Sequence, residues 1–353
     1  MNPRQRILAA IQHQPFDRFP TDIWATPEVW EKLYRRFAIP GRSPTDRLAL
    51  YDQIGIDGIM GIAPPYIGPA LPVRDGIRYD EWGMGYRMQD YGSGSYDEQV
   101  VFPLNQADSL AELEAFPWPS PDWYDYSALP GLAEQYPERT IECGYTAIFY
   151  WHNRLRGLEQ SLVDPLLNPE MTDYLLLRVS DFFTEYHTRC FAALQGKLDL
   201  TQVTDDFGGQ FGLLISPKVF DRFYRRPIQR AIDLAKAYNV LVFHHDDGDC
   251  RPLIPRLVEM GIDVLNPIQW RCGNWDLETL KSQFGSRICF HSAVDNQHTL
   301  PFGTPEEVRS EVRWLRETLG CDRTGLIIAP CHNLQPITPV ENILALYEEA
   351  RLN

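Results

Sequence analysis

Two histidines, three aspartates and a cysteine occupy residues 244–250, directly after the apolar run 240–243. His245 and Asp247 are two positions apart, so in an extended segment their side chains point to the same side, while His244 points to the other. Imidazole nitrogens and carboxylate oxygens are both ligands of zinc. The stretch therefore predicts two ligands of one metal ion. Acid–base chemistry without a metal and a capping turn before the next helix are the alternatives.

Polar side chains also follow other short apolar runs. These runs span residues 198–203, 240–243, 262–265, 288–290 and 326–328. Groups that bind metals, move protons or contact substrates come directly after them, namely Asp205, Asp206, His245, Asp247, Asn266, Gln269, His291, Asp295, Cys331 and His332. In α/β barrels the carboxyl ends of the strands carry the active site. The pattern therefore predicts one site at which these strand ends meet.

The elements between these runs are amphipathic and helical in period, which favours an α/β fold with a parallel sheet. Hydroxyl–proline pairs predict helix starts at residues 26–27, 216–217, 304–305 and 338–339. We expect a single (β/α)8 TIM-like barrel with an N-terminal helix, forming one domain over residues 1–353. Residues 67–119, rich in Gly, Pro, Tyr and Asp, are expected to be an irregular insertion that covers the mouth, with a separate small domain as the alternative.

Composition restricts the class of partner. The net charge of −15 over 353 residues argues against a nucleic acid or an anionic membrane, since both require a basic surface. No apolar run reaches membrane-spanning length, and the first residues show no signal-peptide pattern. The seven cysteines are scattered without a CxxC pair, which indicates a reducing cytoplasm. Four of them are expected to be buried small hydrophobes: Cys143, Cys190, Cys289 and Cys321.

A family resemblance runs through nearly the whole chain. The segments that carry it are residues 2–10, 16–20, 79–83, 205–208, 261–267, 301–308 and 330–342. Together and in this order they resemble the uroporphyrinogen decarboxylase superfamily. The resemblance implies a barrel fold and one of two chemistries. One is cofactor-free decarboxylation of a tetrapyrrole, and the other is zinc-dependent methyl transfer to or from a corrinoid protein or a thiol.

The first barrel strand decides between the two branches. True decarboxylases of this superfamily carry paired arginines there, which clamp the carboxylates of the substrate. The matching residues 20–27 read PTDIWATP, with Asp22 and no arginine. A substrate with many carboxylates would meet the wrong charge at this strand. The chain is therefore closer to the methyltransferase branch.

The methyltransferase branch binds zinc through a His-x-Cys pair and a second cysteine near the last strand. The matching positions hold His245 and Asp247, followed by His332, with Cys331 as the alternative distal ligand. The resemblance thus implies a zinc site with fewer thiolates and harder donors. Such a site suits an oxygen, as in a methyl ether or a carboxylate, better than a thiol.

The full expectation is a cytoplasmic, zinc-dependent methyltransferase that moves a methyl group between a small methylated substrate and a corrinoid protein or similar acceptor. The corrinoid would lie on a separate chain, and a homodimer is compatible with the sequence. A metal-free lyase acting on a small carboxylate or tetrapyrrole and a non-catalytic ligand-binding barrel are the alternatives. The expected catalytic residues are Asp205, Asp206, Glu142 and Tyr145. The expected substrate contacts are Trp24, Tyr150, His152, Asn266, Gln269, His291 and Asp295.

Overall fold

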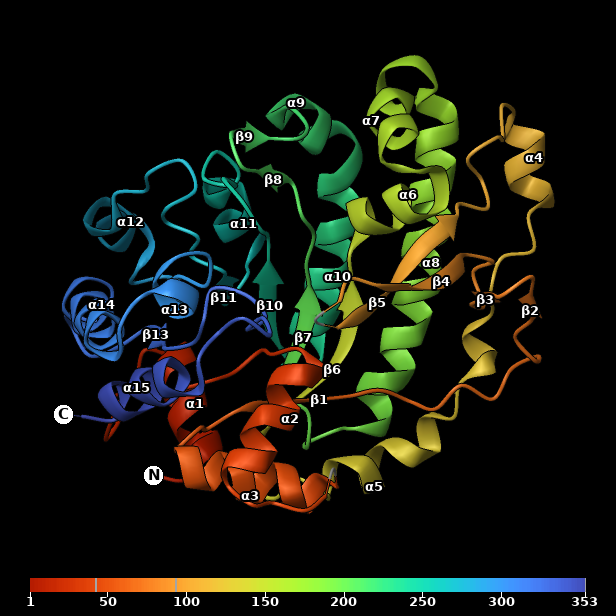
Figure 1. Cartoon of the computed structure of the whole chain (residues 1–353). Helices are drawn as coiled ribbons and strands as arrows, with labels where there is room; N and C mark the ends of the chain where they lie inside the picture. Colours follow the sequence, from red (N-terminus) through yellow and green to blue (C-terminus); the bar gives the residue numbers. More distant parts are fainter. Residues whose placement is uncertain (42, 93, 353) are drawn as a thin grey trace.

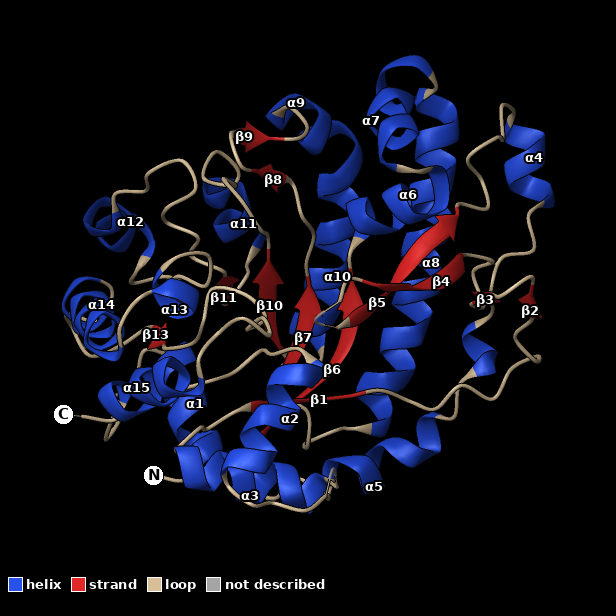
Figure 2. Cartoon of the chain, viewed as in Figure 1, coloured by secondary structure: helices blue, strands red, loops and turns tan. Residues whose placement is uncertain are grey.

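A computed structural model describes residues 1–41, 43–92 and 94–352 of the chain. Seven parallel strands form its central sheet, which curls so that helices surround its outer face (Figures 1 and 2). In spatial order the strands are β1 (Ile59–Ile62), β6 (Thr140–Thr146), β7 (Leu200–Val203), β10 (Leu241–His245), β11 (Val264–Asn266), β12 (Cys289–His291) and β13 (Leu326–Ile327). The five strands predicted from apolar runs are all present, in the predicted parallel arrangement.

The first barrel strand expected from the sequence is not a regular strand. Its residues form only isolated parallel bridges, from Thr21 to Ile328 and from Ala25 to Leu334. On the other side, the Thr21 carbonyl accepts a hydrogen bond from the Asp57 N–H, just before β1. The segment thus lies between the two outer strands, β13 and β1. The structure shows a curled sheet of seven strands, and closure as an eight-stranded barrel stays a prediction.

Helices connect the strands and pack outside the sheet. They are α1 (Pro3–Ile11), α2 (Pro27–Arg36), α3 (Pro44–Ile54), α4 (Leu110–Ala115), α5 (Leu129–Ala133), α6 (Ile148–Arg156), α7 (Leu158–Leu167), α8 (Pro169–Ala193), α9 (Pro217–Val219), α10 (Arg225–Ala237), α11 (Ile254–Met260), α12 (Leu277–Phe284), α13 (Thr299–Phe302), α14 (Pro305–Thr318) and α15 (Val340–Ala350). Short turns of other helix types are η1 (Pro121–Trp123), η2 (Tyr126–Ala128) and η3 (Phe220–Tyr224). Among the described residues, none of these helices has the length and apolar character that crossing a membrane requires.

The hydroxyl–proline pairs predicted the helix starts well. Helices α2, α9 and α14 each begin at the proline of such a pair. At α14 the Thr304 hydroxyl accepts the N–H of Glu307, and the Glu307 side chain accepts the N–H of Thr304. The fourth start was placed one residue early, because Pro339 is extended, with ψ of 140°, and α15 begins at Val340.

The insertion at residues 67–119 is more regular than the sequence predicted. It contains a four-stranded antiparallel sheet of β2 (Val73–Arg74), β3 (Ile77–Tyr79), β4 (Gly85–Asp90) and β5 (Ser95–Val101). Both faces of β4 and β5 are largely exposed, so no apolar alternation revealed these strands. The insertion is anchored by Trp82, which is buried against Phe182 and Phe183 of α8. A small separate hairpin pairs β8 (Gly208–Gly209) with β9 (Gly212–Leu213).

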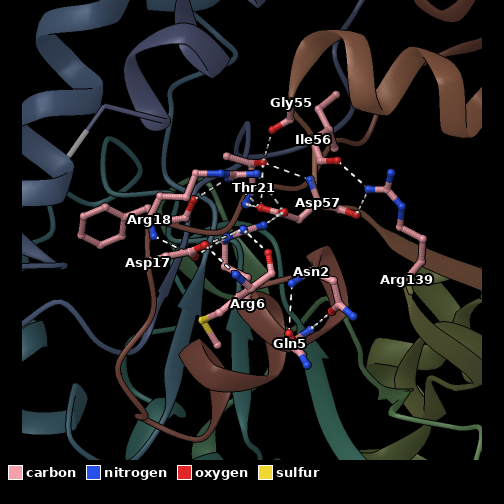
Figure 3. A network of polar contacts seen from close by, with 12 residues as sticks. Asn2, Gln5, Arg6, Asp17, Arg18, Thr21, Gly55, Ile56, Asp57 and Arg139 are labelled. Atoms are coloured by element: carbon pink, nitrogen blue, oxygen red, sulfur yellow. Dashed lines mark hydrogen bonds and ion pairs between the residues drawn. The ribbon is translucent and has the colours of Figure 1, made fainter. Parts of the chain in front are cut away.

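A buried ionic cluster fixes the amino-terminal ends of the strands (Figure 3). Asp57 is fully buried and binds Arg6 of α1, and it also binds Arg18 at 2.9 Å. The same carboxylate accepts the N–H of Thr21 at 3.0 Å. Arg139, the residue before β6, donates to the carbonyls of Ile56 and Asp57. The cluster ties α1, the irregular first segment and β1 together at the end of the sheet opposite the polar strand ends.

The cysteines are free thiols, as expected. Cys143, Cys190 and Cys289 are buried, in agreement with the sequence analysis. Cys321 is exposed, so its predicted burial was wrong. It lies in the turn after α14, beyond the part of that helix whose apolar stripe faces the core.

Candidate metal centre

Three side chains converge at the carboxyl ends of the central strands. His245, Asp247 and His332 each offer one ligand atom, and these atoms lie within 4.8 Å of one another. The Asp247 Oδ2 atom is 3.6 Å from His245 Nε2 and 3.4 Å from His332 Nε2. Ligand atoms of a tetrahedral zinc ion lie roughly 3.3 Å apart, since each is about 2.0–2.1 Å from the metal. The three residues predicted as zinc ligands are therefore brought together, and the two separations from Asp247 are close to that value.

The local backbone explains how β10 presents this pair. His245 is the last residue of β10, while the preceding His244 is fully buried and its Nδ1 lies 2.7 Å from the Val203 carbonyl. Gly248 then adopts a φ of 82°, which favours glycine and turns the chain away from the strand. The Gly248 N–H donates to Oε1 of Gln269 at 2.8 Å. Gln269, predicted to contact the substrate, thus supports the turn that follows Asp247.

A chain of hydrogen bonds runs from His245 into the core. The Oδ1 atom of Asn266 lies 2.6 Å from Nδ1 of His245, and its Nδ2 lies 2.8 Å from Nδ1 of His291. The Nε2 atom of His291 lies 2.9 Å from Oδ2 of Asp22. All three supporting side chains are about 1% exposed. The sequence predicted Asn266 and His291 as substrate contacts, but the structure places them behind His245.

This chain assigns the protons on the two rings. The Asp22 carboxylate can only accept, so His291 donates from Nε2 and its Nδ1 accepts from the Asn266 amide. The Asn266 oxygen then accepts from Nδ1 of His245. The Nε2 atom of a neutral His245 is therefore the one with a free lone pair, and it faces Asp247 and His332. A ligating histidine whose other nitrogen is held by a hydrogen bond is typical of zinc sites.

The charges at the cluster favour a cation. Burial alone lowers the pKa of His245, but Asp247 and Asp206 raise it to about 9. Burial raises the pKa of Asp247, yet His245 and His332 hold it below its usual value. The Oδ1 atom of Asp206 is 3.5 Å from His245 Nε2, and half of its side chain is exposed. Asp206, which the sequence predicted to be catalytic, therefore lies beside this cluster, although it is not one of the three converging ligands.

Trp24 forms one wall of the centre. Its ring lies 5.3 Å from the ring of His245 and 6.2 Å from that of His332. The side chains of Asp247 and His332 are 37% and 38% exposed, so the centre is accessible from outside. Trp24 was predicted to contact the substrate, and its position between both imidazoles and a cavity allows that contact.

Cys331, the alternative distal ligand, points away from the cluster. It is 3% exposed, and its thiol donates to the Ile268 carbonyl at 3.5 Å. Burial raises the pKa of this thiol well above its usual value. A cysteine binds metal as the thiolate, so Cys331 is disfavoured on both position and charge. The neighbouring His332 is the residue that reaches Asp247.

Asp205 has a different position from its neighbour Asp206. Its carboxylate is buried and accepts the N–H groups of Phe149 and Tyr150 at 3.0 and 2.7 Å. It therefore caps the first turn of α6, where the free N–H groups of a helix attract an acceptor. We therefore assign Asp205 to helix capping instead of the catalytic role predicted from the sequence. Each of its two oxygens accepts a backbone N–H group.

Two other predicted residues lie away from the cluster. His152 is fully buried within α6, with its Nδ1 2.9 Å from the Tyr224 hydroxyl. Asp295 is 4% exposed, accepts the N–H of Thr299 at the start of α13 and pairs with Arg271 at 2.6 Å. Neither is brought to the metal centre. His152 was misplaced because its polar run was taken for a strand end, whereas it belongs to a helix.

The predicted residues of β6 lie beside a cavity. Glu142 accepts a hydrogen bond from Gln202 at 2.9 Å, and burial raises its pKa to about 7. Tyr145 is 42% exposed, and its ring meets that of Tyr150 edge-on at 6.1 Å. Gln202 was not predicted from the sequence, although it is the one amide in the strand run 198–203. A polar residue inside a predicted core strand is the signal that could have identified it.

Two cavities lie next to this part of the sheet and share Gly61 of β1. One, of about 410 Å³, is bordered by Glu142 and Tyr145. The other, of about 490 Å³, is bordered by Trp24 and by Asn333, the neighbour of His332. Because Trp24 packs on both imidazoles of the cluster, the second cavity adjoins the metal centre. The first cavity lies beside the same residue of β1, Gly61.

The comparisons with known proteins agree with this architecture. The model of the uroporphyrinogen decarboxylase (URO-D) family matches residues 132–352, more than half of the chain. The chain therefore belongs to the uroporphyrinogen decarboxylase family, which confirms the family predicted from its motifs. A comparison with curated proteins finds no match in sequence.

Solved structures share the fold. A methyltransferase from Methanosarcina mazei superposes with a TM-score of 0.67 and 18% identity, covering 99% of this chain and 98% of that chain. At this identity the similarity shows the fold alone. The xylanase 10B from Thermotoga maritima gives a TM-score of 0.42 and 10% identity over 65% of this chain and 81% of that chain, which is too low to carry an argument.

Proposed function

We propose that this protein is a zinc-dependent methyltransferase that moves a methyl group between a small methylated substrate and a corrinoid protein or similar acceptor. The observation that carries the proposal is the convergence of His245, Asp247 and His332 at the carboxyl ends of the strands. The full-length structural similarity to a methyltransferase supports it. A zinc ion held there would act as a Lewis acid toward an oxygen or other donor atom of a reactant.

The donor set suggests which methylated group is involved. Two imidazoles and one carboxylate form a harder site than one with thiolates, and harder sites favour oxygen partners. A substrate with a methyl ether or a related oxygen fits this preference. Asn266 would orient His245, and Trp24 would exclude water from one side. Glu142, whose pKa is raised by burial to about 7, is able to hold or release a proton near neutral pH.

Residues 20–27 argue against tetrapyrrole decarboxylation because they lack arginine, and not because they carry the negative charge of Asp22. Asp22 is buried and bound to His291, so it does not face a substrate. The expected repulsion from Asp22 was therefore wrong. The argument from the missing arginines remains. Residues 20–27 contain no arginine, so this segment offers no side chain that could bind a carboxylate through two hydrogen bonds.

Metal analysis tests the proposal directly. We expect about one zinc ion per chain by elemental analysis, and we expect chelation to abolish methyl transfer from methyl ethers to cob(I)alamin while the circular dichroism spectrum is unchanged. His245→Ala and His332→Ala should each lose the zinc, whereas His244→Ala should keep most of it. His298→Ala, at an exposed histidine, is the matched control.

Two outcomes contradict the proposal. Full zinc occupancy in both the His245 and the His332 variants would refute this set of ligands. A wild-type protein that is active without metal would instead favour the metal-free lyase. A His332 variant that binds the reactants but does not turn over separates an enzyme from a ligand-binding barrel.

A further inference from the structure

The cavity of about 410 Å³ has an unusual lining. It lies between β1, β6, α8 and the insertion. Seven of the fifteen residues that border it are aromatic, and two are the carboxylates Glu81 and Glu142. No lysine, arginine or histidine is among these fifteen residues. Its walls thus combine ring surfaces with negative charge and offer no positive charge.

The two carboxylates lack a cationic partner. Glu142 receives a hydrogen bond from the neutral amide of Gln202, and Glu81 receives one from the hydroxyl of Tyr124. Within the described part of the chain, neither forms a salt bridge with a basic side chain. A partly buried carboxylate without a counter-ion is costly. A bound cation would remove that cost, whereas an anionic ligand would increase it.

The aromatic rings form a connected wall. The Trp82 ring lies 4.6 Å from that of Trp151 and is stacked on Phe183 at 5.8 Å. Tyr124 meets Tyr186 edge-on at 5.0 Å. The faces of such rings carry negative potential and attract weakly hydrated cations. Several rings with a nearby carboxylate form the cage by which proteins recognise quaternary ammonium groups.

We propose that this cavity binds an alkylammonium group of the substrate, with its alkyl groups against the aromatic wall and its charge balanced by Glu142 and Glu81. This inference rests on the proposed function in one respect, because it takes the bound cation to be the methylated substrate. The cavity borders Gly61, which also lines the cavity at Trp24, so the two cavities lie beside the same strand. The substrate class is then a small organic cation that also bears an oxygen.

A pair of isosteric probes tests the proposal on the unmodified chain. Choline and its uncharged analogue 3,3-dimethyl-1-butanol have the same shape and differ in charge. Both are titrated by calorimetry into the full-length protein, with and without a chelator. Choline should bind about tenfold more tightly, the ratio expected for one cation–π or charge-assisted contact. It should also quench tryptophan fluorescence, because Trp82 and Trp151 line the cavity.

A matched pair of variants locates the binding. Glu142→Gln should weaken choline binding about tenfold and leave the neutral analogue unaffected. Glu114→Gln removes the same charge from an exposed position on α4 and should change neither affinity. If Glu142→Gln does not fold, Tyr124→Phe, which removes the hydroxyl partner of Glu81 and keeps the ring, replaces it.

Equal affinity for the two probes, or no binding of choline, would overturn the proposal. So would choline binding that both glutamate variants retain in full. These titrations do not require a metal, so a failure of the zinc proposal leaves their result standing. Conversely, a zinc enzyme that does not distinguish choline from its neutral analogue would keep the proposed function and lose this substrate class.

Discussion

Asn266 joins His245 to His291, with its side-chain oxygen 2.6 Å from one ring and its nitrogen 2.8 Å from the other. The two ends of an amide have opposite hydrogen-bonding character, so this single side chain determines which nitrogen carries the proton in each neutral ring. The direction of the chain is fixed at its far end by Asp22, which accepts from His291.

Removing this bridge should weaken metal binding without touching a ligand. Asn266→Leu keeps the approximate size of the side chain and loses both hydrogen bonds, and we expect zinc affinity to fall by about 10–100-fold. Asp22→Asn should have a smaller effect, since it acts through His291. Competition with a chromophoric chelator measures both affinities, and thermal unfolding checks the fold. An unchanged zinc affinity in Asn266→Leu would contradict the role given to this chain.

Cys331 should be dispensable for the metal. Its thiol is buried against the Ile268 carbonyl, so Cys331→Ala should keep the zinc while losing some stability. In the native protein, iodoacetamide should label Cys321, which is exposed, and leave Cys331 unmodified. Peptide mass spectrometry after a short exposure checks both expectations. Loss of zinc from Cys331→Ala, with His332 intact, would make the cysteine the distal ligand.

Porphyrinogen substrates should not be decarboxylated. Without arginines in residues 20–27, a substrate with many carboxylates lacks the bidentate partners it needs there. We expect the decarboxylation of uroporphyrinogen to be no faster than without enzyme. Chromatography of the products, after their oxidation to porphyrins, measures this rate. Decarboxylation at an ordinary enzymatic rate would reverse the order of the two branches.

The buried cluster around Asp57 should control stability but not the metal. Asp57→Asn removes the charge that compensates Arg6 and Arg18, and breaking a buried pair in this way costs about 3–5 kcal/mol. Urea unfolding measures the change in free energy. Zinc content should be unchanged, because the cluster lies at the opposite ends of the strands. Asp75→Asn, at an exposed turn, is the control for loss of one carboxylate.

Binding of choline should depend on pH through Glu142. Burial raises the pKa of Glu142 to about 7, so the carboxyl is largely neutral below that pH and charged above it. The groups that act on it are Gln202 and Asp22, and Glu81 borders the same cavity; none of these supplies a positive charge. Affinity should rise about tenfold between about pH 6 and about pH 8, as the charged fraction does. In Glu142→Gln this dependence should disappear.

The raised pKa of Glu142 also affects the stability of the fold. Whereas choline affinity should rise with pH, this contribution to stability should fall with pH. A carboxyl whose pKa is higher in the folded state favours the folded state when it is protonated. The contribution of Glu142 is therefore fully present below the ordinary glutamate pKa and is lost as the pH rises to about 7. Glu142→Gln should remove this part of the pH dependence of urea unfolding.

Local pattern was sufficient to place two of the three converging side chains on one side of a strand. The spacing of His245 and Asp247 follows directly from the two-residue period of an extended chain. His332 was assigned through the family resemblance, which places a distal ligand near the last strand. Strands of the core were identified because their apolar runs are continuous. For His245, Asp247 and the strands, the information lies within a few residues of the feature that it predicts.

Local sequence pattern could not predict the roles of residues whose partners lie far away in the chain. Asn266 and His291 were recognised as polar strand ends, but their function depends on Asp22, which is 269 residues away from His291. Asp205 was assigned to catalysis because its helix partner, α6, comes earlier in the chain. The insertion strands were missed because both of their faces meet solvent, so burial leaves no period in their sequence.

Trp24 and His332 meet at the centre although they lie near opposite ends of the described sequence. One wall and the end of the hydrogen-bond chain come from the first 24 residues, while the distal ligand lies at residue 332. The wall residue and this histidine are thus about 300 residues apart in the chain. The centre is therefore assembled from long-range contacts, which form late in folding because loop closure must precede them.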